Sequence, residues 1–222
     1  LPASPSTQPP ARPPKPPIAR ASLGPPHVAT RGAASHDRIM ILEVMGRDAG
    51  HIALAAGIAG GADVILIPEI PYDIQNVADH IKALRQSGRN FALVVVSEAV
   101  RRQGGEKQMN EFFGGQKRLG GIGHVIGAQI SELCQAETRV TVLGHVQRGG
   151  QPSAQDRLMA AAFGVHAVDL LAAGKSGRMV AWSNRQVIDV SIADAVKHCQ
   201  MVEKHGSLMK TARGLGICFG DK

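Results

Sequence analysis

The stretch RVTVLGHVQRGG, residues 139–150, decides the fold of this chain. The β-branched residues that follow Arg139 predict a buried strand over 140–143, which ends at a glycine. His145 and Arg148 come directly afterwards, at the carboxyl end of the strand, where open α/β sheets bind their ligands. Two cations and a histidine thus surround one strand, and they indicate a binding site for an anion.

Outward from this stretch, strand and helix signals alternate along the chain from residue 38 onward. We expect strands at 38–44, 63–68, 91–97, 140–143, 178–182 and 186–190. We expect helices at 48–59, 73–87, 119–136, 153–173 and 191–204, and a loop rich in glycine and charge between the third strand and the third helix. Strands that alternate with helices predict an α/β fold, an open and mostly parallel sheet in three layers.

Three of the expected helices begin at residues that suit an N-cap. Asp73 precedes the second helix, Ser153 with Asp156 three residues later begins the fourth, and Ser191 begins the last. The tail at 211–220 is too short and too rich in glycine to assign. It is interpreted as a segment that completes the fold.

Composition excludes several classes of protein. The chain has 222 residues, 44% of them hydrophobic, which is enough for one or two packed domains. No apolar run reaches the roughly 18 residues of a membrane helix, and no apolar signal segment precedes the first strand. Cys134, Cys199 and Cys218 are odd in number and widely spaced, so they fit neither a disulfide framework nor a zinc site. These features predict a cytoplasmic protein with no membrane partner.

Residues 1–32 form a proline-rich leader, since ten of the 13 prolines lie in residues 1–26. Proline removes backbone donors and favours extended conformations, so we expect the leader to be disordered. Much of the net charge of +7 belongs here, because residues 1–35 contain four basic residues and no acidic ones. Without aromatic residues for base stacking, this charge predicts no nucleic-acid partner. A docking ligand for an SH3-type partner and a translated non-native leader are the alternatives.

The familiar nucleotide-binding loops are missing from the sequence. No G-x-x-x-x-G-K-[ST] motif occurs, and the glycines at 120–123 and 214–216 miss the G-x-G-x-x-G spacing. Polar and loop residues gather instead at the ends of the expected strands, namely Arg38, Met45, Gly46, Arg47, Glu98, Arg139, His145 and Arg148. Arginine forks grip phosphate oxygens and a carboxylate accepts sugar hydroxyls, so this set favours a sugar phosphate.

Several segments together resemble the 6-phosphofructokinase family. They are HDR at 36–38, EVMGR at 43–47 with Gly50, IAGGAD at 58–63, PE at 68–69 and TVLGHVQRGG at 141–150. The resemblance runs in register from about residue 33 to at least Gly177, which is more specific than any one motif. It implies a phosphofructokinase-like fold and a transferase of glycolysis, a kinase that works with ATP and magnesium as a homotetramer or dimer.

The resemblance implies that the arginines and the histidine hold the sugar phosphate. Arg38 and Arg139 are expected to reach across a subunit interface to the 6-phosphate of fructose 6-phosphate. His145 and Arg148 are expected to contact the sugar phosphate within their own subunit. Function would then depend on a homo-oligomer that shares its substrate site between subunits.

The remaining positions are implied to surround the reacting groups. Met45, Gly46 and Arg47 would line the sugar and the transferred phosphoryl group, and Glu98 would accept a sugar hydroxyl. The implied reaction transfers a phosphoryl group in line to the C1 hydroxyl, mostly through positioning and charge neutralisation.

Each residue also has a plainer interpretation. Arg38 or Arg139 alone would be an ordinary surface charge, and Glu98 would serve equally well as the partner of a helix N-cap. Met45 is typical of core packing, and Gly46 of a tight turn. The shared register with the family favours the functional interpretation.

The family's nucleotide-binding half has no match in this sequence. Its glycine-rich phosphate loop, its magnesium-binding aspartate and its catalytic base would precede residue 33. We therefore expect no catalytic, cofactor or metal residues here, and expect Mg²⁺ and ATP (or pyrophosphate) to bind elsewhere in the complete enzyme. The chain is interpreted as a fragment or a mispredicted gene product that is inactive alone.

Regulation also departs from the allosteric bacterial members. Asp63 keeps a carboxylate at the family's effector-metal position, but the run 87–91 keeps a single cation, which argues against effector control. The run at 118–123 resembles the branch of the family that includes pyrophosphate users. The donor itself stays open, because the residues that select it lie in the half without a match.

We therefore expect three parts: the leader at 1–32, a sugar-phosphate-binding α/β domain at 33–146, and a segment at 147–222. The last would return to the nucleotide-binding domain and close the fold. Two functions fit this division, the sugar-phosphate half of a phosphofructokinase or a non-catalytic sugar-phosphate-binding or regulatory module. A third outcome is a chain that does not fold alone, because its second lobe exposes apolar surface.

Overall fold

The computed structural model describes residues 38–105, 109–112, 116–197 and 199–221. The predictions for the proline-rich leader therefore lie outside the described residues. The chain forms two compact units. The described part of the first, called the sheet unit, is 38–151 with 200–221, and the second, called the α5 unit, is 152–199.

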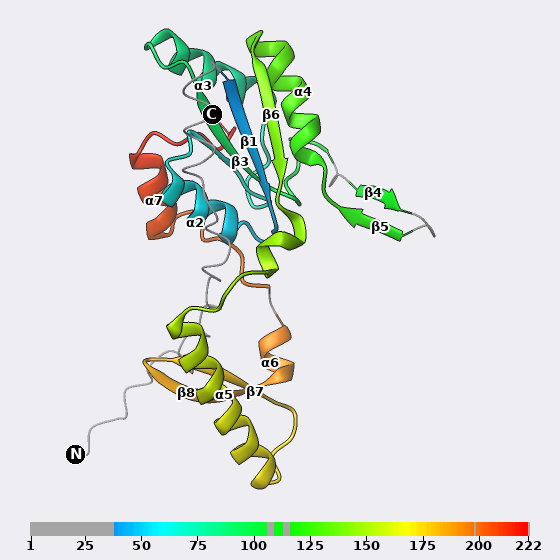
Figure 1. The fold of residues 1–222 in the computed structure, drawn as a ribbon, viewed down its shortest axis with the longest axis vertical. Helices are drawn as coiled ribbons and strands as arrows, with labels where there is room; N and C mark the ends of the chain where they lie inside the picture. Colours follow the sequence, from blue (N-terminus) through cyan, green and yellow to red (C-terminus); the bar gives the residue numbers. More distant parts are fainter. Residues whose placement is uncertain (1–37, 106–108, 113–115, 198, 222) are drawn as a thin grey trace, which may run out of the picture. The chain divides into compact units, whose positions relative to one another are not determined.

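The centre of the sheet unit is a four-stranded parallel sheet (Figure 1). Its strands are β1 (Arg38–Val44), β2 (Val64–Leu66), β3 (Ala92–Ser97) and β6 (Glu137–Val142), in the order β2-β3-β1-β6. Because all four are parallel, their carboxyl ends meet at one edge of the sheet and their amino ends at the other. The predicted α/β class is confirmed.

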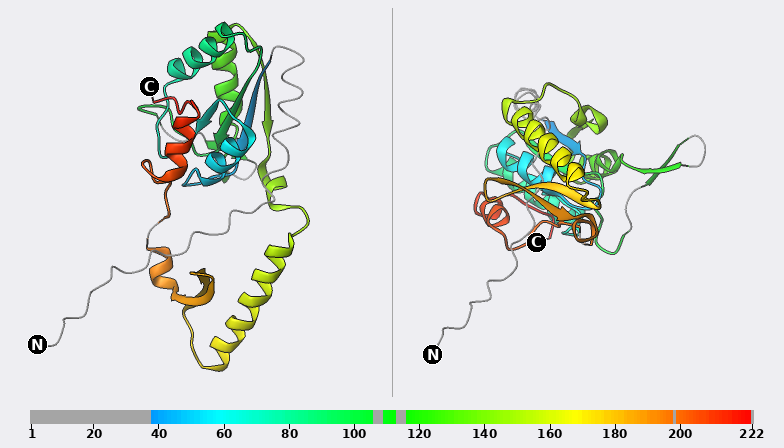
Figure 2. Two further views of the ribbon diagram at one scale, coloured as in Figure 1. Left: turned by 90° about the vertical axis from the view of Figure 1, so that its left-hand side faces the viewer. Right: turned by 90° about the horizontal axis from the view of Figure 1, so that it is seen from below.

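Helices cover both faces of this sheet, as Figure 1 and Figure 2 show from two sides. Alternate strand residues point to opposite faces, which separates the core into two clusters. The first cluster packs against α3 (Ile74–Gln86) and α4 (Ile122–Cys134), and the second against α2 (His51–Gly60) and α7 (Ser207–Gly214). The predicted three layers are therefore present.

Local signals explain why α3 forms where it does. The side chain of Asp73 accepts a hydrogen bond from the Gln75 N–H (2.9 Å), which confirms the predicted N-cap. The residues at 74, 77, 78 and 81 are buried on one stripe, so the helix packs against the sheet as its periodicity predicts.

Strand β6, from which the sequence analysis began, is less buried than its sequence predicts. β6 pairs only with β1 among the described strands, and Val142 remains 44% exposed. The prediction of a buried strand at 140–143 is therefore wrong for the described structure. β-Branched residues show that a segment is extended, but they do not show how many neighbours cover it.

The α5 unit packs a long helix against a two-stranded antiparallel hairpin. It contains α5 (Ala154–Ala172), β7 (Arg178–Ser183), β8 (Gln186–Ser191) and α6 (Ile192–Val196). The predicted start of α5 is confirmed, since Ser153 and Asp156 form a capping box.

The predicted helix over 191–204 is wrong in its extent. α6 ends at Val196, and the Ser191 side chain makes no cap hydrogen bond. Residues 199–203 are not helical, and the Val202 N–H donates to the Glu69 carboxylate (2.8 Å). A contact across 133 positions of sequence cannot be read from local periodicity.

Four elements were absent from the prediction. The expected loop after β3 contains a hairpin of β4 (Met109–Phe112) and β5 (Gln116–Leu119), the 3₁₀ helix η2 (Gly144–Arg148) follows β6, and α7 occupies part of the unassigned tail. The tail does complete the fold, because Cys218 forms a parallel bridge to Val64 beside β2. No helix in the described ranges is long and apolar enough to cross a membrane.

Candidate functional site at the carboxyl edge of the sheet

The backbone that follows β1 is held by side chains that follow β3. Glu98 accepts a hydrogen bond from the Gly46 N–H through Oε1 (3.2 Å), and the Ser97 hydroxyl donates to the Gly46 carbonyl (2.9 Å). The Glu98 N–H in turn donates to the Val44 carbonyl (2.9 Å). Adjacent parallel strands therefore bring two of the predicted site residues, Gly46 and Glu98, into direct contact.

A glycine is required at position 46 by this close approach. A β-carbon there would lie 2.4 Å from the Ser97 hydroxyl oxygen and 3.0 Å from the Ala49 carbonyl oxygen. Contacts this short are not found for real side chains, so any larger residue would displace the loop or Ser97. The two interpretations of Gly46, as a tight turn and as a site residue, are compatible, since the turn presents the loop backbone at the edge of the sheet.

Gln147, to which the sequence assigned no role, ties this loop to η2. Its Oε1 accepts a hydrogen bond from the Met45 N–H (2.7 Å), and the residue is only 7% exposed. The sequence did contain an indication that Gln147 belongs to the site, because it lies between the predicted site residues His145 and Arg148. Nothing local in the sequence indicated that its amide would contact a residue 102 positions away.

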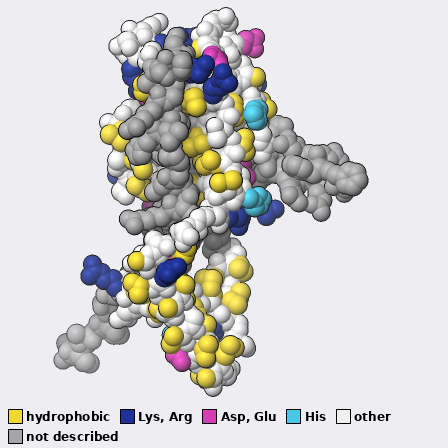
Figure 3. All heavy atoms as spheres, viewed as in Figure 1, with side chains coloured by type: hydrophobic (Ala, Val, Ile, Leu, Met, Phe, Trp, Pro, Cys, Tyr) yellow, Lys and Arg dark blue, Asp and Glu magenta, His cyan; other side chains and the backbone are white. Residues whose placement is uncertain are grey.

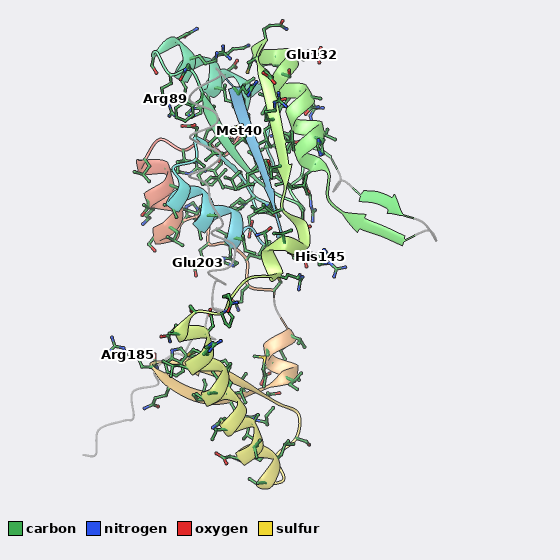
Figure 4. All side chains as sticks on the ribbon, in the orientation of Figure 1. Met40, Arg89, Glu132, His145, Arg185 and Glu203 are labelled. Atoms are coloured by element: carbon green, nitrogen blue, oxygen red, sulfur yellow. The ribbon has the colours of Figure 1, made fainter. Side chains whose placement is uncertain are left out.

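The charged residues of this edge face solvent. Arg47, His145 and Arg148 are exposed, and Figure 4 shows His145 at the end of the sheet opposite to Glu132. His145 and Arg148 both lie in the last turn of η2. Six of the predicted residues, Met45, Gly46, Arg47, Glu98, His145 and Arg148, thus belong to the segments that follow three neighbouring strands at one edge.

The other end of the same loop is fixed by Glu69, which follows β2. Both carboxylate oxygens lie 3.1 Å from the Gly50 nitrogen, and Oε1 also accepts from the Val202 N–H (2.8 Å). Gly50 is the N-cap of α2 and offers no side-chain cap, so a buried carboxylate from another strand satisfies the start of that helix. His51 Nε2 lies 2.8 Å from the Gln200 carbonyl oxygen.

A second buried carboxylate, that of Glu43, accepts hydrogen bonds from the start of α4. Glu43 on β1 is 2% exposed and accepts hydrogen bonds from the Gly121 N–H (2.9 Å) and the Gly123 N–H (2.8 Å). A β-carbon on Gly123 would lie 3.0 Å from Glu43 Oε2, so the glycine makes this approach possible. Two helices that pack on the sheet are therefore capped by strand carboxylates that no local capping pattern predicts.

The remaining two predicted residues lie at the opposite edge. Arg38 begins β1 beside Glu137, and Arg139 is the second residue after Glu137 on β6. The Glu137 carboxylate binds both guanidinium groups, Arg38 Nε at 2.7 Å and an Arg139 terminal nitrogen at 2.6 Å. The hydrogen bond from Arg38 and the charges of both arginines lower the pKa of Glu137 below its ordinary value. The structure brings Arg38 and Arg139 together, but not with the other six.

Asp63, the predicted effector-metal position, has protein partners for both of its carboxylate oxygens. Its Oδ1 binds Arg89 (2.5 Å), and its Oδ2 accepts from Arg89 (3.1 Å) and from the Leu93 N–H (2.8 Å). The guanidinium also stacks over Phe91, 4.7 Å from the ring centroid. Through these contacts Asp63 anchors the start of β2 to β3, in an ion pair whose carboxylate is buried and whose guanidinium is partly exposed. The described residues contain no group of three or more metal-ligating side chains.

Together, these contacts define a class of protein: a parallel α/β protein with a rigid backbone loop and exposed cations at the carboxyl edge of its sheet, the arrangement that binds anionic ligands. Residues 27–171 match the family described as Phosphofructokinase. The chain belongs to the phosphofructokinase family.

Relatives and solved structures agree with this assignment. An ATP-dependent 6-phosphofructokinase 1 of Synechocystis is 61% identical over 85% of this chain and 52% of its own length. An ATP-dependent 6-phosphofructokinase of Chloroflexus aurantiacus is 50% identical over 86% and 52%. The chain thus spans about half the length of these curated relatives.

Two solved structures share the fold. A phosphofructokinase of Saccharomyces cerevisiae has a TM-score of 0.63 and 30% identity, covering 77% of this chain and 22% of its own. A pyrophosphate-dependent phosphofructokinase of Nitrosospira multiformis has a TM-score of 0.67 over 90% of this chain and 53% of its own. At 23% identity the second supports the fold alone.

Proposed function

We propose that this chain is the sugar-phosphate half of an ATP-dependent 6-phosphofructokinase and that it binds fructose 6-phosphate at the carboxyl edge of its sheet. The observation that carries the proposal is the loop at Met45 and Gly46. Gln147 and Glu98 hold this loop by hydrogen bonds, and His145 and Arg148 lie in the same 3₁₀ helix as Gln147. Charge-assisted hydrogen bonds from the histidine and the arginine would hold the phosphate.

The fixed loop backbone suits the reacting end of the sugar. Phosphoryl transfer requires little covalent chemistry from the protein, so it depends on groups that are positioned before the substrate arrives. Met45, Gly46 and Arg47 would line the sugar and the transferred group. Glu98 would accept a sugar hydroxyl with its second carboxylate oxygen, while Oε1 keeps the Gly46 N–H.

Arg38 and Arg139 support a site that is shared between subunits. Arg38 begins β1 and Arg139 is the third residue of β6, two strands whose carboxyl ends lead to the main site, so both bind Glu137 toward the opposite edge of the sheet. Within one chain they cannot reach a sugar phosphate held by His145. A neighbouring subunit of a homo-oligomer, a dimer or a tetramer, would bring them to its own substrate.

The donor and the general base are proposed to belong to the half of the enzyme that this chain does not match. The names of the curated relatives favour ATP as the donor. When bound, magnesium and ATP would supply the phosphoryl group and neutralise its charge. The domain division at 33–146 and 147–222 remains part of this proposal.

The α5 unit is proposed to pack against that other half. α5 is apolar on several sides, and Leu158, Val165 and Leu171 are each at least 65% exposed. Figure 3 shows hydrophobic side chains over the surface of this unit. A helix that is hydrophobic around its circumference normally becomes buried in the assembled protein.

Calorimetric titration of the full chain with fructose 6-phosphate tests the proposal, with fructose as the control ligand. We expect binding of the phosphorylated sugar alone. His145→Ala and Arg148→Ala should each weaken it about tenfold or more, because each removes a charge-assisted hydrogen bond. The matched variants His124→Ala and Arg157→Ala, exposed residues on α4 and α5, should bind like the wild type.

Sedimentation velocity on the same samples is part of the design, because Arg38 and Arg139 would act across an interface. A wild-type oligomer that gives no response to fructose 6-phosphate would contradict the proposed function. Equal affinities of the wild type and both site variants would contradict the assigned residues.

A further inference from the structure

We propose that Gln147 is a positioning residue of the sugar-phosphate site, which holds the loop Met45–Arg47 in register with His145 and Arg148. This inference rests on the proposed function and extends it to a residue that contacts no substrate. Its role is to fix the distance between the loop and η2, so that both parts of the site meet one ligand.

Gln147 connects the two parts of the proposed site, the loop Met45–Arg47 and η2. Gln147 lies in η2 between His145 and Arg148, which are both exposed, whereas its own side chain is 7% exposed. Its Oε1 accepts the Met45 N–H at 2.7 Å, at the point where the chain leaves β1. This hydrogen bond joins a side chain of the turn after β6 to the backbone at the end of β1.

The neighbouring contacts of the loop do not replace this bond. Ser97 and Glu98 hold the carbonyl and the N–H of Gly46, and they come from the strand on the other side of β1. Without Gln147 the loop would still be fixed to β3. Its position relative to the turn that carries His145 and Arg148 would then depend more on the β1–β6 strand pairing and on the hydrogen bond from the Leu143 N–H to the Glu43 carbonyl (3.1 Å).

The amide nitrogen of Gln147 shows that a contribution to stability does not explain why a glutamine occupies this position. The Nε2 group is buried and has no hydrogen-bond partner among the described residues. Leaving a buried donor unpaired costs at least as much free energy as the hydrogen bond to Met45 contributes. Such a cost is tolerated where a position serves function, because packing alone would favour an apolar side chain.

This balance predicts an unusual phenotype for Gln147→Met, a change that nearly conserves volume. The variant loses the acceptor for the Met45 N–H, but it also removes the unpaired Nε2 donor. Its unfolding midpoint should therefore stay within about 2 °C of the wild type. Its affinity for fructose 6-phosphate should fall about tenfold, because the loop is no longer held against η2.

Two measurements on the full chain decide the matter, calorimetric titration with fructose 6-phosphate and hydrogen exchange of the Met45 amide. Exchange at Met45 should become at least about tenfold faster in Q147M, since its amide loses a buried acceptor. Gln86→Met, the same change at an exposed glutamine of α3, should alter neither quantity.

The outcomes separate this inference from the proposed function. If the wild type does not bind fructose 6-phosphate, the proposed function fails and the inference fails with it. If the wild type binds and Q147M binds equally well, the inference alone is overturned. A lower unfolding midpoint in Q147M with unchanged affinity would show a merely structural role and would overturn it too.

Discussion

The two edges of the same sheet differ in how their charged and polar groups are held. At the carboxyl edge, buried and half-buried side chains hold backbone groups: the buried Glu69 holds Gly50 and Val202, and the half-buried Glu98 holds Gly46. At the amino edge, Glu137 binds Arg38 and Arg139 in exposed ion pairs. One edge is built before a ligand arrives, whereas the other is a set of side chains that remain free to exchange partners.

The difference follows from the energetics of burial. A buried carboxylate is stable only if it keeps its hydrogen bonds, so its partners become fixed. An exposed ion pair gains little over hydration, so a phosphate or another carboxylate can replace its acid at small cost. The carboxyl edge therefore suits a permanent site within one chain, and the amino edge suits arginines that act on a neighbour's ligand.

Removal of Glu69 should break the carboxyl edge most severely. Glu69→Ala leaves the Gly50 and Val202 N–H groups without their acceptor, and it uncaps α2. We expect the free energy of unfolding to fall by about 3 kcal/mol. Urea denaturation followed by circular dichroism measures this loss.

Glu132→Ala, on the exposed face of α4, is the matched control and should change stability by less than about 0.5 kcal/mol. Glu69→Gln, which keeps one acceptor oxygen, should lie between E69A and the wild type. Equal stability of E69A and E132A would show that the two edges do not differ as described.

A methyl group at position 46 should strain the same edge less severely. Gly46→Ala places a β-carbon 2.4 Å from the Ser97 hydroxyl oxygen, so the loop must move. We expect a loss of about 1 to 3 kcal/mol in unfolding free energy and weaker binding of fructose 6-phosphate. Both follow from denaturation and calorimetry on one preparation.

Gly164→Ala provides the opposite control, because a β-carbon at this position in α5 meets no atom within 4 Å. Alanine favours helix, so G164A should gain up to about 1 kcal/mol. The double variant Gly46→Ala/Ser97→Ala should be less destabilised than the sum of its single changes, since the clash involves the serine oxygen. Additive losses would argue against that contact.

Loss of Glu137 should have the smallest effect. Glu137→Gln removes an exposed acid, so its unfolding midpoint near neutral pH should stay within about 2 °C of the wild type. The hydrogen bond from Arg38 lowers the pKa of Glu137 from its ordinary value of 4.5. The contribution of this carboxylate to stability is therefore present above that value, and it is lost as the pH falls through the lowered pKa.

Thermal unfolding of the wild type and E137Q between neutral and acidic pH measures this contribution, and the two midpoints should converge at low pH. A large gap at neutral pH would mean that the amino edge is as fixed as the carboxyl edge.

Much of the sheet unit was predictable, because its signals are local. The bounds of β1 and the cap at Asp73 follow from neighbouring residues, as does the cap at Ser153 in the α5 unit. The bond of Val202 to Glu69 was not predictable, because the two residues are 133 positions apart, and no local stop signal marks the end of α6 at Val196. Six of the eight predicted site residues lie near one another because they follow adjacent parallel strands.

By itself, the sequence determined the α/β class, the order of the four strands of the parallel sheet along the chain, and the family to which the chain belongs. Only the tertiary structure decided which predicted residues share an edge, since Arg38 and Arg139 lie toward the amino ends of strands whose carboxyl ends lead to the others. It also decided the partners of three polar side chains: Asp63 pairs with Arg89, Glu69 accepts from two distant N–H groups, and Gln147 accepts from the Met45 N–H. The physical reason is that a buried polar group takes the partner that the packed elements bring to it, and periodicity along the chain carries no record of that partner.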